Sequence, residues 1–336
     1  MKRTLALLAF LALAPGQALA WGFTGHTMIS RLGAESLPET LPAFLRSPDA
    51  IDELAYMGPE EDRIKGSGQS WDEDNDDAHF LDIGDDGKVA GVVNPNALPR
   101  DMEAYSDALS SASTSPYKVG FIPYAIMDGF ERVRMDLAYW RVEAYLATHA
   151  ASGDGRAKAA HERDLSQMLT LRDIGDWSHF VGDGSQPLHV TIHYNGWGDY
   201  PNPHNYTTNH IHSFFESEFV DKYAKIDAVR ALMPARALPP ADHLLTQDEI
   251  SVAVGAYLEA SAQQVDPLYA LYASGAFTSG SKEAVSFTDL QLARGAAMLR
   301  DLTALAWESS YYAKVGYPAV PVEDILSGKA ALNSSD

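Results

Sequence analysis

The sequence contains no cysteine, so no disulfide can cross-link the folded chain. Positive charge is also scarce, because 25 Lys and Arg residues face 46 Asp and Glu residues and leave a net charge of −21 at pH 7. A protein of that charge does not attract nucleic acid by its overall field, which argues against high-affinity DNA binding. A metal-dependent enzyme that handles phosphates transiently remains possible, since bound divalent cations offset part of the charge locally.

Only one stretch is strongly apolar, and it lies at the start of the chain. Residues 1–20 combine a basic start, an apolar run and an Ala-Leu-Ala end, which is typical of a signal peptide cleaved after Ala20. A membrane anchor needs about 20 consecutive apolar residues, and Pro15 interrupts this run too early. We therefore expect an exported protein, periplasmic or extracellular, whose mature chain begins at Trp21 and has no transmembrane segment.

Alternating short strands, glycine-rich phosphate loops and internal repeats are all missing from the sequence. Apolar residues instead recur at spacings of three and four, which predicts helices over residues 127–146, 161–181 and 284–307. Irregular segments are expected at residues 66–77, 83–99, 195–209 and 234–241. Because none of them resembles a linker, we expect one mainly α domain with long loops over residues 21–320, followed by a C-terminal tail at 321–336.

The densest acidic run is WDEDNDDAHFLDIGDDG, residues 71–87. A calcium-binding loop needs oxygen ligands at alternating positions and a closing glutamate at about the twelfth position, and no register of this run supplies them. We expect a solvated acidic loop here.

Histidines are concentrated in one region, where six of the eleven lie between residues 179 and 212: His179, His189, His193, His204, His210 and His212. Two of the six precede a carboxylate by four residues, in the pairs His179–Asp183 and His212–Glu216. Each pair projects from one helix face and can close on one ion, and imidazole with carboxylate suits zinc. An ordinary surface helix pair is the alternative for either one alone. Pro187 is expected to end or bend the first helix, which would turn His189 towards a neighbouring ion.

Signal cleavage would add further ligands at the new N-terminus. The sequence WGFTGH places a free α-amino group and a carbonyl at Trp21, with His26 five residues on. An α-amino group with a pKa near 8 can lose its proton to a metal and become a ligand. Cleavage would then complete a metal site.

The Trp start with its nearby histidine, Asp62, HFLD at 79–82, HFVGDGSQPLH at 179–189 and the late His-x3-Glu together resemble the zinc-dependent phospholipase C/S1–P1 nuclease superfamily. The resemblance follows the order of the ligands over most of the mature chain and is close in sequence mainly at 179–189. It implies a single-domain helix bundle of the phospholipase C/P1 nuclease type with long loops around three zinc ions. By position, the three ligand sets would be Asp62, His79, His179 and Asp183; His189, His212 and Glu216; and Trp21, His26 and the other oxygen of Asp183.

The resemblance implies phosphodiester hydrolysis by attack of a metal-activated hydroxide on phosphorus, with Asp62 and Lys65 at catalytic positions. No Ser-His-Asp arrangement is visible to supply a protein nucleophile. An S1/P1-type endonuclease acting on single-stranded DNA or RNA is favoured, because Phe80 and Asp82 match positions that stack on a base and hydrogen-bond its edge. Lys65 falls where these nucleases place an arginine near the phosphate.

A phospholipase C acting on phosphatidylcholine-like lipids is the alternative. Its support is Glu216, which replaces the aspartate of most nucleases, and the aromatic segment HYNGWGDYPNPHNYTTNHIH at 193–212. Those aromatic rings would either cage a choline ammonium group or simply pack over the zinc ions. A secreted zinc-binding protein without turnover is a remote third possibility. None of these interpretations implies an obligate protein partner.

Overall fold

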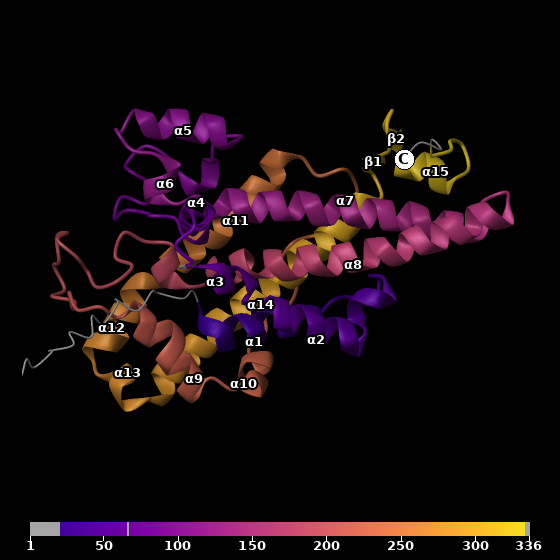
Figure 1. Ribbon diagram of the computed structural model, residues 1–336. Coiled ribbons are helices and arrows are strands. Elements are labelled where there is room, and N and C mark those ends of the chain that lie inside the picture. The colour runs from indigo at the N-terminus through magenta and orange to yellow at the C-terminus, as the bar shows by residue number, and fades with distance from the viewer. Residues whose placement is uncertain (1–20, 66, 333–336) are drawn as a thin grey trace, which may run out of the picture.

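The computed structural model describes residues 21–65 and 67–332, so the expected signal peptide at 1–20 lies outside the described residues. Its longest feature is a hairpin of two helices, α7 (Ile122–His149) and α8 (Gly153–Asp183), which run side by side in Figure 1. Pro123 occupies the first turn of α7, where its missing N–H costs nothing. Ser152 caps α8 by accepting a hydrogen bond from the Gly155 N–H at 3.0 Å.

A third long helix, α14 (Lys282–Ser310), packs against both arms of the hairpin and against α1 (Gly22–Glu35). Most side chains of α14 are buried, and α2 (Pro48–Met57) covers the other side of α1. The helices predicted from apolar spacing at 127–146, 161–181 and 284–307 are thus confirmed as α7, α8 and α14. All three extend beyond the predicted bounds, because caps and turns rather than apolar spacing set where a helix ends.

Short helices fill the connections around these long ones. Before α7 lie η1 (Ala43–Arg46), α3 (Glu60–Ile64), α4 (Ser70–Asp76), η2 (Asp77–His79), η3 (Pro95–Ala97), α5 (Met102–Ser110) and α6 (Pro116–Val119). Between α8 and α14 lie η4 (Pro187–His189), η5 (Phe214–Phe219), α9 (Val220–Tyr223), α10 (Ile226–Ala231), α11 (Gln247–Ala262), α12 (Val265–Ala273) and α13 (Ala276–Ser279). The described chain is therefore mainly helical, and none of its helices is long and apolar enough to cross a membrane.

The segment expected as a C-terminal tail contributes to a small core of its own. Strands β1 (Lys314–Val315) and β2 (Val320–Pro321) pair antiparallel and lead into α15 (Val322–Leu326). The buried side chains of Val322 and Ile325 pack with Val142 of α7. This packing lies at the end of the hairpin far from the end of α8 that carries Asp183.

Two larger hydrophobic clusters meet around the end of α8. One contains Val181 of α8 together with α7, α2 and part of α14. The other contains Trp21, Leu188 and Phe215 together with α12 and the first half of α14. Polar side chains at the end of α8 therefore lie between two apolar cores and are shielded from water on both sides.

One prediction about the loops is wrong. The sequence predicts an irregular segment at residues 66–77 and a solvated loop for the acidic run that begins at residue 71, but residues 70–76 form α4 and the Asp72 side chain is buried. Asp72 Oδ2 accepts hydrogen bonds from the Gly68 N–H and the Ser67 hydroxyl, each at 3.2 Å, which compensates the burial of the carboxylate. The other three segments, 83–99, 195–209 and 234–241, are irregular as predicted apart from the short η3.

Candidate metal centre

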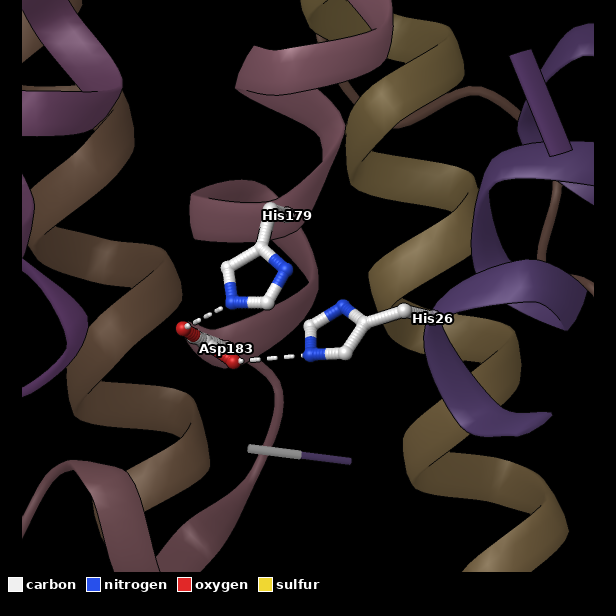
Figure 2. A group of neighbouring side chains, drawn as sticks. All are labelled: His26, His179 and Asp183. Carbon is white, nitrogen blue, oxygen red and sulfur yellow. Dashed lines mark ion pairs between the residues drawn. The ribbon is translucent and has the colours of Figure 1, made fainter. Parts of the chain in front are cut away.

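The first group of converging side chains lies where α8 ends against α1. His179 and Asp183 are one turn apart on α8, and His26 projects from α1 to meet them (Figure 2). His26 Nε2 is 3.3 Å from Asp183 Oδ1, and His179 Nε2 is 3.4 Å from Asp183 Oδ2. The two imidazole rings stack at a centroid distance of 3.8 Å, and all three side chains are inaccessible to solvent. The two oxygens of Asp183 thus face different histidines.

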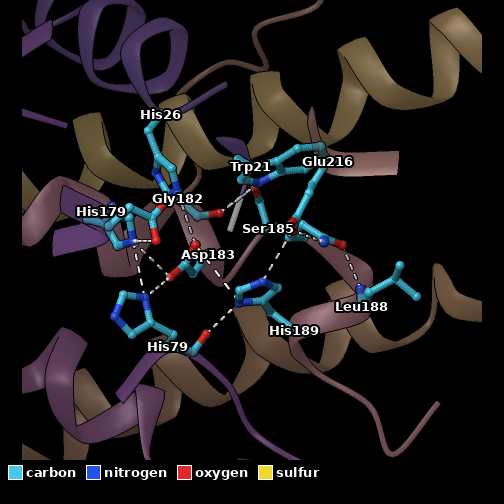
Figure 3. A network of polar contacts seen from close by, with 12 residues as sticks. Trp21, His26, His79, His179, Gly182, Asp183, Ser185, Leu188, His189 and Glu216 are labelled. Carbon is cyan, nitrogen blue, oxygen red and sulfur yellow. Dashed lines mark hydrogen bonds and ion pairs between the residues drawn. The ribbon is translucent and has the colours of Figure 1, made fainter. Parts of the chain in front are cut away.

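The second group joins His179 to residues from α3 and η2. His79 Nδ1 lies 3.1 Å from His179 Nε2 and 3.0 Å from Asp183 Oδ2, and Asp62 Oδ1 lies 3.7 Å from His179 Nε2. His179 and Asp183 therefore contact residues of both groups, so the two groups form one continuous cluster (Figure 3).

The third group is His189, His212 and Glu216. His212 Nε2 is 2.8 Å from Glu216 Oε2, and His189 Nε2 is 3.7 Å from the same oxygen. The expected α-helical turn between His212 and Glu216 is a π-helix, η5, which begins at Phe214. Such wide turns are rare in proteins, and those that occur are often found at functional sites. Pro187 does not end or bend α8 as expected, because α8 already ends at Asp183 with Gly184 as its C-cap. Pro187 instead begins η4, the short turn that carries His189 beside His212 and Glu216.

Backbone carbonyls fix the orientation of three of these rings. The Nδ1 atoms of His179, His189 and His212 lie 2.9, 2.6 and 2.9 Å from the carbonyl oxygens of Gly58, His79 and Tyr194. A neutral ring that donates from Nδ1 carries its lone pair on Nε2, which is the atom that faces the cluster in each case. A second hydrogen bond of this kind is the usual support of a metal-binding histidine.

Several buried oxygens of the cluster have no hydrogen-bond partner among the described residues. They are both carboxylate oxygens of Asp62, Oδ1 of Asp183 and Oε1 of Glu216. An unpaired buried carboxylate is costly unless a cation compensates it. Lone pairs from imidazole and carboxylate thus converge without enough protons to satisfy them, and the three buried groups can hold metal ions.

Burial shifts the protonation of these groups in the metal-free protein. Burial raises the pKa of Asp62 and of Asp183 to about 7, and it lowers the pKa of His79 and of His179 well below the ordinary value. In the metal-free protein the histidines of the first two groups therefore stay neutral, and the two carboxyl groups take up protons as the pH falls below about 7. At the third group, burial alone would lower the pKa of His212, but the carboxylate of Glu216 outweighs it and raises that pKa.

Trp21 is anchored beside the cluster. Its indole N–H donates to the Gly182 carbonyl at 3.0 Å and to the Ser185 hydroxyl at 2.9 Å, on either side of Asp183 in sequence. Gly22 follows with a positive φ of 52°, and a Cβ there would approach Ser217 Oγ to 2.8 Å. The start of α1 thus touches the turn that carries Glu216. The free α-amino group expected at Trp21 depends on the segment outside the described residues.

A cavity of about 390 Å³ opens onto the second and third groups. His79, His189 and His212 form part of its wall, and the same wall contains Lys65, Phe80 and Asp82. Lys65 Nζ is 4.0 Å from Asp62 Oδ1, and its side chain is largely buried. All the predicted catalytic and substrate-binding residues therefore lie within reach of the metal-binding groups. A larger cavity, of about 530 Å³, opens between α7 and α8 and is lined by none of the predicted ligands.

The aromatic side chains of the 193–212 loop divide between the interior and the surface, where Tyr194 and Tyr200 are exposed. Trp197 is buried and stacks on His193 at 3.7 Å, and Tyr206 packs on Trp197 at 4.8 Å. Only Tyr194 among the loop aromatics lines the 390 Å³ cavity. Packing over the protein interior therefore describes Trp197 and Tyr206 but not the exposed rings of Tyr194 and Tyr200.

Two supporting residues were not identified from the sequence. Gln186 is fully buried, and its amide donates to Glu216 Oε2 at 3.4 Å while its oxygen accepts from the Leu188 N–H at 2.7 Å. His193 lies between the Trp197 carbonyl and Asp85 Oδ1, each 2.8 Å from one ring nitrogen, and so ties the loop that carries His212 to the segment after Asp82. Gln186 could have been identified from the sequence, because it lies inside the 179–189 motif. The role of His193 could not, because its partner Asp85 is distant in sequence.

Comparison with known proteins gives no match to the chain among protein-family profiles, curated proteins or solved structures.

Proposed function

We propose that the chain is an exported zinc-dependent phosphodiesterase of the S1/P1 nuclease kind, which cleaves single-stranded DNA or RNA. The observation that carries the proposal is the shared wall of the 390 Å³ cavity. There, His79, His189 and His212 of two metal-binding groups lie beside a cation, an aromatic ring and a carboxyl group, which are Lys65, Phe80 and Asp82. A phosphodiester bound at the histidines would have its base within reach of Phe80.

Zinc is the metal that these groups suit best, with one ion in each of the three. Histidine nitrogens with one or two carboxylates are zinc ligands, whereas calcium and magnesium take oxygen ligands almost alone. Ligand atoms about 2.1 Å from a tetrahedral zinc are roughly 3.4 Å apart. Separations such as 2.8 Å for His212–Glu216, 3.4 Å for His179–Asp183 and 3.7 Å for His179–Asp62 lie around that value. A helical bundle of the phospholipase C/P1 type is part of the same proposal.

Each residue of the centre has a distinct task in this proposal. Asp62, His79 and His179 would hold one ion, Glu216 with His189 and His212 another, and His26 with Trp21 the third, with Asp183 facing two of them. Zinc ions act as Lewis acids towards phosphoryl oxygens and lower the pKa of water to about 7. Lys65 adds positive charge next to Asp62, where a phosphate approaches the cluster. The backbone carbonyls of Gly58, His79 and Tyr194 keep the ligand rings oriented.

Phe80 and Asp82 would bind the nucleobase. Stacking on one aromatic ring contributes about 1–3 kcal/mol and accepts any base, which suits a nuclease without sequence preference. Burial, reinforced by Asp77, raises the pKa of Asp82 to about 7. Near neutral pH its carboxyl group therefore can donate or accept a hydrogen bond at the base edge.

The phospholipase alternative has weaker support in the loop that suggested it. Recognition of a choline ammonium group needs several aromatic faces around the cation. Trp197 is buried with Tyr206 packed on it, and of the two exposed rings, Tyr194 and Tyr200, Tyr194 lines the cavity together with Phe80. A zinc-binding protein without turnover would have no use for Lys65, Phe80 and Asp82 beside the ligands.

The test is a parallel assay of zinc-loaded protein beginning at Trp21 on single-stranded DNA, RNA and phosphatidylcholine, with and without chelator. We expect chelator-sensitive cleavage of the nucleic acids, abolished by His179→Ala. His161→Ala is the matched control, because His161 is exposed on the same helix, five turns away from His179. Release of phosphocholine without nucleic acid cleavage would establish the phospholipase instead, and metal binding without any hydrolysis would establish the non-catalytic alternative.

A further inference from the structure

A second lysine lies on the wall of the 390 Å³ cavity, and it differs from Lys65 in its exposure to solvent. Lys118 belongs to α6 and lines the same cavity as Lys65, Phe80 and the three histidines. Lys65 is largely buried and lies next to Asp62, whereas Lys118 is exposed. The cavity therefore has one cation close to the metal ligands and another where it opens to solvent.

The backbone holds α6 firmly against the segment that carries Phe80 and Asp82. The Asp82 N–H donates to the Val119 carbonyl at 2.8 Å, and the Ile122 N–H donates to the Phe80 carbonyl at 3.1 Å. Gly120 has a positive φ of 80°, and a Cβ there would lie 2.1 Å from the Phe80 carbonyl oxygen, so only glycine permits this approach. Lys118 thus keeps a fixed place relative to the proposed base site, which a lysine on a free loop would not.

Charge makes this position unusual. The chain has a net charge of −21, yet Lys118 forms no ion pair with any carboxylate in the described part of the chain. Asp76, Asp77 and Asp82 line the same cavity and would repel an anion. The pKa of Asp82, raised by burial to about 7, removes part of that negative charge near neutral pH.

The volume of the cavity indicates which part of a bound substrate would lie beside Lys118. Small-molecule sites enclose about 300–1,000 Å³, so 390 Å³ holds roughly one nucleotide unit. A phosphate attached to that unit but not to the reacting centre would then lie at the opening, beside the exposed ammonium group of Lys118. A phosphocholine head group offers no second phosphate, and its own ammonium group would be repelled there.

We propose that Lys118 binds a phosphate next to the scissile one, so that the enzyme selects chains with at least two phosphodiester groups over diesters with a single phosphate. This inference rests on the proposed function and adds to it a residue that distinguishes substrates with several phosphates from those with one. Lysine acts here as a point charge, without the paired hydrogen bonds of arginine.

The experiment compares zinc-loaded wild type with Lys118→Gln, Lys118→Arg and Lys282→Gln. Lys282 is an exposed lysine at the start of α14, which contributes no residue to the cavity, so its replacement makes the same change in net charge elsewhere. For each protein, kcat/KM is measured on a short oligothymidylate and on bis(p-nitrophenyl) phosphate over a range of salt concentrations. The second substrate has one phosphate and serves as the internal reference.

We expect Lys118→Gln to lower kcat/KM on the oligothymidylate about fivefold at low salt, and to lower it more than on the one-phosphate diester. The dependence of log(kcat/KM) on log[salt] should become shallower by about 0.7, the value for one phosphate contact on a single strand. Lys118→Arg should restore both, and Lys282→Gln should behave as wild type.

Equal losses on both substrates, or an unchanged salt slope, would overturn the role of Lys118 while wild-type cleavage of oligothymidylate upheld the nuclease. Failure of wild type to cleave oligothymidylate at all would overturn the proposed function itself. A loss in Lys282→Gln equal to that in Lys118→Gln would show that only overall charge matters, which also contradicts the inference.

Discussion

His189 and His212 point their Nε2 atoms at each other across 3.1 Å, while Nδ1 of each ring lies within hydrogen-bond distance of a backbone carbonyl. Two neutral rings that donate from Nδ1 would bring two lone pairs face to face beside the carboxylate of Glu216. A metal ion held by His189, His212 and Glu216 would resolve this conflict by accepting all three lone pairs, and without one a ring must take up a proton. The pKa of His212 is raised by the carboxylate of Glu216, so in the metal-free protein His212 is the ring that takes up this proton.

The shared position of Asp183 leads to a prediction about the number of bound ions. Its two oxygens face His26 at 3.3 Å and His79 at 3.0 Å, whereas Glu216 faces only the third group. We expect Asp183→Ala to retain about one zinc ion and Glu216→Ala about two, measured by native mass spectrometry or elemental analysis. Equal losses in the two variants would contradict the bridging role of Asp183, and His161→Ala should keep the full complement.

Replacement of Phe80 by alanine should separate substrate binding from metal binding. Loss of one stacking contact of about 1–3 kcal/mol predicts a decrease of roughly 5- to 150-fold in kcat/KM on single-stranded DNA. Zinc content and melting temperature should stay close to those of wild type, because Phe80 is only half-buried and is not a ligand. An unchanged rate would remove Phe80 from the base site.

The stability of the centre should depend on pH in opposite ways with and without metal. Burial raises the pKa of Asp62 and Asp183 from 3.8 to about 7, so the metal-free folded protein holds protons that the unfolded chain has lost. The stability these carboxyl groups contribute is full below about pH 4 and is lost as the pH rises through 7. Metal ions bind the deprotonated carboxylates and reverse the trend.

The difference in melting temperature between zinc-loaded and chelator-treated protein should therefore be larger at pH 8 than at pH 6. Circular dichroism at both pH values measures it, with Asp183→Asn as the variant in which the change with pH becomes smaller. A difference that shrinks as the pH rises would contradict the assignment of these carboxylates as ligands.

The contact between His193 and Asp85 should control the loop that carries Tyr194. Only a ring with both protons donates to the Trp197 carbonyl and to Asp85 together. Because the Asp85 side chain is 55% exposed, its replacement by asparagine should cost no more than about 1 kcal/mol. His193→Phe should cost more, since it also leaves the Trp197 carbonyl without its donor.

We expect both variants to raise KM for single-stranded DNA more than they lower kcat, because Tyr194 and the His212 ring depend on the loop. Asp199→Asn, an exposed acid in the same loop, is the control for charge. Steady-state kinetics and thermal denaturation measure the two effects. A pure loss of kcat with unchanged KM would show that the loop does not shape the substrate site.

The three long helices were predictable because apolar side chains at regular spacing bury one face of a helix, whatever surrounds it. The same rule fails for the acidic run, because it predicts that charged side chains are exposed. The sequence WDEDNDD was expected to be a solvated loop, but Asp72 finds backbone and hydroxyl donors within five residues and becomes buried. Such local compensation does not appear in a hydropathy pattern.

Two pairs of the candidate centre, His179–Asp183 and His212–Glu216, were predictable from residue type and four-residue spacing, whereas Asp62 and His79 were expected only from the family resemblance. Their supports were not, because the acceptors for Nδ1 are carbonyl groups, which every residue has. The π-helical turn at η5 was also missed, since His-x3-Glu reads as an α-helical pair and the wider turn arises from packing of Phe215 and Phe219 against Trp21 and Phe277.

The most direct test of the central claim is anomalous diffraction at the zinc absorption edge, on crystals of the protein beginning at Trp21 and grown with zinc. We expect three anomalous peaks, one beside Asp62, His79 and His179, one beside His189, His212 and Glu216, and one between His26 and Asp183. Peaks only at surface residues, with all eight of these side chains free of metal, would contradict it.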